Sequence, residues 1–152
     1  MNRRSIFSVG LAAMALVPLF GRKADAAVEK KQHKLAIHVD QNDPAVMRLA
    51  LGNSRNAHEL YAAMAENIAI EIVCYSQGVH MLRDDTSPVK EEIKALRTKV
   101  PQVAFGACNN TKKGMEKREG KTITIIPEAT LVPAGVVRLV ELQELGYKYV
   151  KP

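Results

Sequence analysis

The pattern of apolar and polar residues predicts short strands separated by helices. Three runs are almost continuously apolar and rich in β-branched residues, which is typical of strands buried on both faces. These runs are residues 35–40, 68–75 and 103–107. Two further extended segments are predicted at residues 122–126 and 147–150.

The segments between these runs carry apolar residues at helical spacing. Helices are predicted over residues 44–65, 87–99, 109–119 and 133–145, with a turn at residues 76–82. Asp43 and Ser87 are typical N-cap residues, Pro44 suits a first helical position, and Gly120 is a typical helix end. The alternation of buried strands and helices predicts a single-domain, three-layer α/β fold, with a mostly parallel sheet covered by helices on both faces.

The beginning of the chain has the layout of an export signal. Arg3 and Arg4 precede an apolar run over residues 6–20, and small residues follow. The run is shorter than the ~20 apolar residues that span a bilayer, so a cleavable signal is favoured over a stable membrane anchor. The arginine pair resembles a twin-arginine signal, which predicts a bacterial periplasmic protein. The predicted organisation is an export signal at 1–26, a mobile lead-in at 27–33 and a folded domain at 34–152.

Composition and charge exclude several classes of function. The 152 residues are 47% hydrophobic and 25% charged, which is typical of a globular domain rather than a disordered chain. The formal net charge is +6, and cleavage after residue 26 removes four basic residues and one acidic residue, which leaves +3. This mild charge argues against a nucleic-acid partner. The glycines form no nucleotide-binding fingerprint, so no cofactor is predicted.

Candidate chemistry lies where the predicted strands end. Ligands of open parallel sheets bind beyond the carboxyl ends of the strands. These ends are His38 and Asp40 in the first strand, Tyr75 in the second and Cys108 in the third, and we expect them to converge. Cys108 directly precedes a predicted helix, whose unpaired N–H groups and positive dipole end favour a thiolate. Cys108 is therefore either a reactive thiol or a small buried hydrophobe.

Neighbouring residues add three expectations. Asn109, Asn110 and Thr111 form the predicted helix N-terminus that would bind a group next to the thiol. His38 is a candidate helper that orients or deprotonates the thiol. The histidines and cysteines lack the short spacing of metal motifs, so no metal site is predicted.

The second cysteine, Cys74, lies inside a predicted strand. Burial among apolar residues raises a thiol pKa and hides the sulfur, which favours an inert role. In an oxidising compartment, however, a disulfide between Cys74 and Cys108 is an alternative, provided that their Cα atoms lie within roughly 7 Å. Such a bridge would make the protein a redox switch.

Several segments resemble the DsrE/DsrF-like sulfur-relay family. One is VAFGACNNT at residues 103–111, followed by Met115; another is VPAGVVRL at residues 132–139, continuing to the end of the chain. The opening strand with His38 and the following helix also match, so the resemblance covers about residues 34–152. It implies a compact α/β fold that assembles into trimers or hexamers. It also implies that Cys108 accepts sulfane sulfur as a persulfide and passes it on.

Two features depart from the family's pattern: Cys74 stands where no thiol is expected, and the export signal places the chain outside the cytoplasm. The leading hypothesis is an exported, sulfurtransferase-like sulfur carrier that uses Cys108, with an unknown donor and acceptor. An oligomeric module that binds a small anion without covalent chemistry is the second hypothesis, and the Cys74–Cys108 redox switch is the third.

Overall fold

The computed structural model describes residues 31–152, which form a five-stranded sheet in the order β4-β3-β2-β1-β5. Every neighbouring pair of strands in this sheet is parallel. The strands are β1 (Gln32–Val39), β2 (Asn67–Cys74), β3 (Val103–Cys108), β4 (Thr130–Val132) and β5 (Lys148–Val150). The predicted α/β fold is thereby confirmed.

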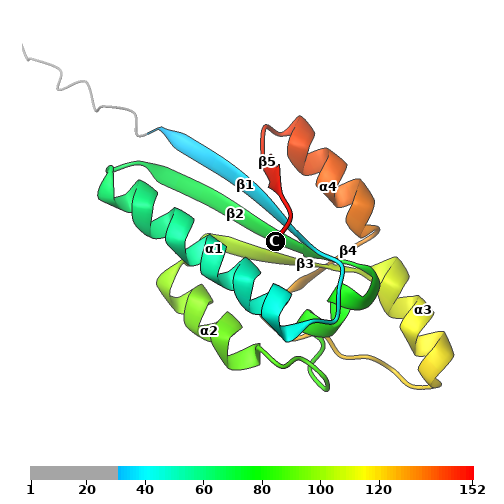
Figure 1. Ribbon diagram of the computed structural model, residues 1–152. Helices are drawn as coiled ribbons and strands as arrows, with labels where there is room; N and C mark the ends of the chain where they lie inside the picture. Colours follow the sequence, from blue (N-terminus) through cyan, green and yellow to red (C-terminus); the bar gives the residue numbers. More distant parts are fainter. Residues whose placement is uncertain (1–30) are drawn as a thin grey trace, which may run out of the picture.

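Helices cover both faces of the sheet (Figure 1). They are α1 (Pro44–Ala63), the 3₁₀ helix η1 (Ser76–Leu82), α2 (Lys90–Lys99), α3 (Asn109–Glu119) and α4 (Gly135–Glu144). Helices α1 and α2 pack on one face, where Met47 and Ile93 join a core with Ile72. Helix α4 packs on the other face, where Leu139 contacts the cluster around Val73. Alternation along β2 therefore sends Ile72 and Val73 into different layers.

Helix α3 follows β3 without an intervening loop, beyond the carboxyl end of the sheet (Figure 1). Its one buried side chain, Met115, packs with Cys108, Val79 of η1 and Ile123. The helix ends at Gly120, whose φ of 67° is the left-handed conformation that glycine adopts readily. This arrangement places η1 and the beginning of α3 next to each other at the end of β3.

The predicted strand at residues 122–126 is wrong: β4 lies further along the chain, at Thr130–Val132. Within residues 122–126 only an isolated antiparallel bridge between Ile125 and Arg83 occurs. The side chain of Ile123 is buried under α3, and its N–H donates to the Glu116 carboxylate at 2.9 Å. The Thr124 carbonyl accepts from the Asp84 N–H and the Ile126 N–H donates to the Leu82 carbonyl, each at 2.9 Å, so the segment pairs with residues 82–84 and not with the sheet.

The beginning of the fold also differs from the prediction. Strand β1 begins at Gln32, so His33, which we expected in the lead-in, belongs to the sheet. The predicted export signal and residues 27–30 lie outside the described residues. Within residues 31–152, no helix combines the length and apolar character that crossing a membrane requires.

Candidate functional site

The carboxyl ends of the three central strands bring His38, Tyr75 and Cys108 to one edge of the sheet. The Tyr75 ring stacks on the His38 ring with centroids 4.4 Å apart and an interplanar angle of 21°. On its other side, Tyr75 packs against the cluster that contains Cys108. Tyr75 therefore lies between the other two residues and couples them by packing.

Cys108 is the N-cap of α3, and only 5% of the residue is exposed. Its Sγ accepts a hydrogen bond from the backbone N–H of Thr111 at 3.4 Å. Burial raises the pKa of the Cys108 thiol, but hydrogen bonds from Thr111, Gly135 and Asn110 lower it by more, so the pKa lies below its ordinary value. The predicted helix N-terminus thus acts on the sulfur through Thr111 and Asn110.

A second helix also begins beside this sulfur. Cys108 is the register partner of Val132 in β4, and α4 begins three residues later, at Gly135. The backbone N–H of Asn110 donates to the Pro133 carbonyl at 3.3 Å, which ties the start of α3 to the segment before α4. The N–H groups that stabilise the thiolate therefore come from two helices.

Helices η1 and α3 lie side by side next to Cys108. The backbone N–H of Ser76 donates to Thr111 Oγ1 at 3.1 Å and joins the two elements. Ser76 has a φ of 50°, which is unusual for a residue other than glycine. A shallow pocket here is lined by Ser76, Gln77, Asn110, Thr111, Gly114 and Arg118. Arg118 brings a positive charge to this pocket.

His38 belongs to a second polar cluster, at the ends of β1 and β5. Its Nδ1 lies 2.9 Å from the Tyr149 hydroxyl, and its Nε2 lies 3.9 Å from Asp40 Oδ2. The same Asp40 oxygen accepts a hydrogen bond from Lys151 at 2.8 Å. Burial lowers the pKa of His38, and Lys151 adds to this, while Asp40 opposes it. The pKa of His38 therefore lies below its ordinary value, which favours the neutral ring.

The proposed helper role of His38 finds no direct contact in this arrangement. No hydrogen bond joins His38 to Cys108 in the described part of the chain, and Tyr75 separates them. Across residues 31–152, no three His, Cys, Asp or Glu side chains gather in a way that would hold a metal ion.

Cys74 lies in the other layer of the fold. It is fully buried in the core under α1 and α2, with its Sγ 3.9 Å from the sulfur of Met81. Burial raises the pKa of this thiol far above its ordinary value. Both cysteines are free. Cys74 is the register partner of Ala107, the residue before Cys108, so the two cysteines lie on adjacent strands, but the alternation of side chains sends the two thiols to opposite faces of the sheet. This geometry does not support a disulfide between Cys74 and Cys108.

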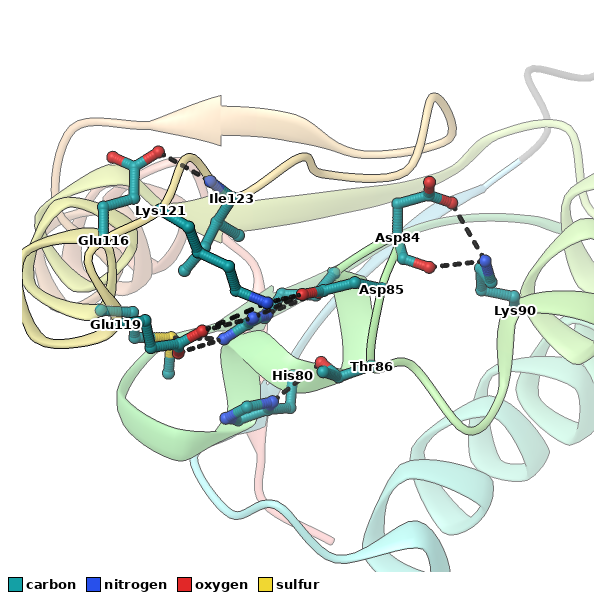
Figure 2. A network of polar contacts seen from close by, with 11 residues as sticks. His80, Asp84, Asp85, Thr86, Lys90, Glu116, Glu119, Lys121 and Ile123 are labelled. Carbon is teal, nitrogen blue, oxygen red and sulfur yellow. Dashed lines mark hydrogen bonds and ion pairs between the residues drawn. The ribbon is translucent and has the colours of Figure 1, made fainter.

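Sequence reasoning missed two buried ion pairs near the site. Glu71, in the middle of apolar strand β2, pairs with Arg138 of α4. Arg83, which is 1% exposed, donates to Asp85 and Glu119. Figure 2 shows these two carboxylates on either side of nitrogen atoms to which dashed lines join them. The signal for the first pair was present, since a charged residue in a continuous apolar strand needs a partner.

Comparison with known protein families finds no match, and comparison with curated proteins finds none either. Among solved structures, the chain is similar to one from Methanobacterium thermoautotrophicum, described as a protein of unknown function, MTH1491. The two are 30% identical and superpose with a TM-score of 0.66, over 79% of this chain and 99% of the archaeal chain. The chain therefore belongs to the same family as this archaeal protein of unknown function.

Proposed function

We propose that this protein is a sulfur carrier that holds sulfane sulfur as a persulfide on Cys108. The observation that carries the proposal is the position of the Cys108 sulfur, which lies where both α3 and α4 begin and has a pKa below its ordinary value. A thiolate is the form that attacks sulfur. The resemblance of residues 103–111 and 132–139 to the DsrE/DsrF-like family agrees with this role.

The loading step needs no additional oxidant. With thiosulfate as donor, the Cys108 thiolate attacks the outer sulfur, and a new sulfur–sulfur bond forms. The old sulfur–sulfur bond breaks, and sulfite leaves with its electron pair. The product is an anionic persulfide, so the total charge is the same before and after the step. In the unloading step, an acceptor thiolate attacks the terminal sulfur, and the Cys108 thiolate leaves.

The surroundings of Cys108 suit each part of this exchange. The N–H groups that stabilise the thiolate also stabilise it as a leaving group in the unloading step. Arg118 lines the adjacent pocket and attracts an anionic donor. Cys108 is 5% exposed, so reaction requires separation of η1 from α3 at the Ser76–Thr111 hydrogen bond. We infer that the donor enters there.

Mass spectrometry tests the proposal directly. Anaerobic incubation with polysulfide or thiosulfate is expected to add about 32 Da to the protein, the mass of one sulfur atom. The adduct is expected to disappear in Cys108→Ala and to persist in Cys74→Ala, which removes the buried thiol instead. Absence of the adduct from the wild-type protein, or its survival in Cys108→Ala, would contradict the proposal.

The second candidate is a module that binds a small anion without covalent chemistry, and the pocket beside Arg118 favours it. In this case, sulfate or thiosulfate raises the melting temperature equally in the wild-type protein and in Cys108→Ala, and no adduct forms. The variant Arg118→Gln should then abolish the stabilisation. Stabilisation that depends on Cys108 would speak for the carrier.

We further propose that the protein is a homo-oligomer, in keeping with the family resemblance. Helix α4 supports this, because Val136, Val137 and Val140 turn an apolar face away from the core and are 59%, 51% and 50% exposed. Trimers or hexamers would cover this face.

Export to the periplasm also remains our proposal, supported by Arg3 and Arg4 ahead of the apolar run at 6–20. Replacing both arginines by lysine is expected to retain the precursor in the cytoplasm. N-terminal sequencing of the exported protein should begin at Ala27.

A further inference from the structure

A partly buried ion pair connects the middle of the sheet to helix α4. Glu71 of β2 is 7% exposed and faces α4. Arg138 donates from Nε to Glu71 Oε1 at 2.8 Å and from Nη2 to Glu71 Oε2 at 2.7 Å, so that both carboxylate oxygens are held. Two parallel hydrogen bonds of this kind fix direction as well as distance.

The neighbouring strand, β3, has a glycine where it faces this pair. A side chain at Gly106 of β3 would place its Cβ 3.3 Å from Glu71 Oε1, closer than ordinary contacts. The glycine therefore leaves room for the carboxylate against β3. Arg138 also contacts the exposed carboxylate of Glu141 at 3.2 Å, but Glu141 belongs to α4 itself and cannot tie the helix to the sheet.

The arginine lies in the turn of α4 that begins beside the candidate sulfur. Its backbone N–H donates to the Ala134 carbonyl at 3.0 Å, which closes the first turn of the helix. Gly135, the first residue of this turn, packs so closely on Tyr75 that a Cβ there would lie 2.8 Å from the tyrosine Cβ. Tyr75 in turn packs against the cluster of Cys108. A displacement of Arg138 would therefore move the helical turn that packs on Tyr75, beside the cluster of Cys108.

We propose that Glu71 and Arg138 are positioning residues for the Cys108 sulfur. The pair fixes the first turn of α4 against β2, and this sets the direction of the Gly135 N–H group. The inference rests on the thiolate role that the proposed function gives to Cys108. It also accounts for a charged pair at a place where apolar residues would fill the same space without a desolvation cost.

The experiment compares two glutamates that contact the same arginine. Glu71→Gln keeps the shape of the side chain but weakens the buried contact, whereas Glu141→Gln removes the exposed one. The rate of Cys108 alkylation by iodoacetamide is measured against pH, with mass spectrometry to identify the modified thiol. Glu71→Gln is expected to shift the profile to higher pH and to lower the rate at pH 7 about two- to fivefold, the range for loss of a helix N-terminus. Glu141→Gln is expected to leave the profile unchanged.

Arg138→Lys provides the second test, because it keeps the charge and loses the paired hydrogen bonds. It is expected to shift the profile in the same direction. A lower melting temperature with an unshifted profile in both variants would show that the pair acts only on stability and would overturn the inference. Loss of cooperative unfolding in both variants would overturn it as well, since the pair would then be a requirement of the fold.

The outcome separates this inference from the proposed function. A shifted profile in Glu71→Gln, without any persulfide on the wild-type protein, would leave the positioning role standing and reject the carrier. A persulfide on wild-type Cys108, with an unshifted alkylation profile in the variants, would support the carrier and reject the positioning role.

Discussion

Removal of the buried arginine beside α3 is expected to be among the most destabilising single substitutions. Arg83 is 1% exposed and donates four hydrogen bonds to Asp85 and Glu119 (Figure 2). It thereby ties the segment after η1 to the last turn of α3. Arg83→Met leaves no buried charge, because the two carboxylates are 40% and 32% exposed and Lys121 remains beside them. The loss is therefore that of hydrogen bonds between charged groups, which contribute about 1.5–3 kcal/mol each, and we predict a total loss of about 3 kcal/mol.

Thermal and urea unfolding at pH 7 measure this effect. For a domain of this size, 3 kcal/mol corresponds to a decrease of about 10 °C in Tm. Lys121→Met is the matched control, because this 54% exposed lysine contacts the same Asp85 and Glu119 from the solvent side. We expect the control to cost less than about 1 kcal/mol. A loss below about 1 kcal/mol in Arg83→Met, or equal losses in both variants, would refute the reasoning.

The destabilisation caused by Arg83→Met is expected to depend on pH. Hydrogen bonds from Arg83 and then Lys121 hold the pKa of Asp85 well below its ordinary value of 3.8, and Arg83 likewise lowers the pKa of Glu119. Below about pH 4 the unfolded chain binds protons that the folded protein does not, so this stabilisation is present above pH 4 and lost as the pH falls. The difference in the free energy of unfolding between the wild-type protein and Arg83→Met should therefore become smaller below pH 4. A constant difference down to pH 2 would contradict this.

Three further predictions concern the site and its surroundings. Alkylation of Cys108 in the folded protein should begin at lower pH than that of free cysteine, because hydrogen bonds stabilise its thiolate, while Cys74 stays unmodified until the protein unfolds. Mass spectrometry after timed labelling distinguishes the two cysteines. Coincident pH profiles for Cys108 and free cysteine would contradict a stabilised thiolate. Gly135→Ala should lower stability by about 1–3 kcal/mol, because its Cβ would lie 2.8 Å from that of Tyr75, and an unchanged Tm would contradict this packing. Val140→Glu should yield a folded protein of lower mass in light scattering, whereas an unchanged mass would exclude this face from the interface.

The fold was largely predictable because its strands are buried on both faces. Residues 35–40, 68–75 and 103–107 are apolar runs that occur as β1, β2 and β3 within a few residues of the predicted ends. Their carboxyl ends meet at one edge, which is why His38, Tyr75 and Cys108 were found by reading strand ends alone. Residues 122–126 show that an alternating pattern alone does not predict membership of the sheet. Their alternation is that of a strand, yet Ile123 is buried under α3 rather than in the sheet.

The contacts that organise the site depend on residues far apart in the sequence. Gly135 is separated from Cys108 by α3, a loop and β4, so no local pattern showed that a second helix begins beside the thiol. The pairing of Glu71 with Arg138 joins residues 67 positions apart. His38 was assigned to the thiol because it lies at a strand end, but its ring contacts Tyr75 and Tyr149 instead. A shared position at the carboxyl edge of the sheet was therefore not enough to predict a contact between His38 and Cys108.

The two borders of the sheet have a consequence for how molecules of this protein meet. Strands β4 and β5 are three residues long, and Lys148 and Lys151 lie at the β5 border. An extended peptide laid along β4 or β5 would find only three residues of backbone to pair with, and the charge of Lys148 disfavours its approach to β5. Growth into a continuous intermolecular ribbon is therefore blocked, and helical surfaces are left as the route for self-recognition.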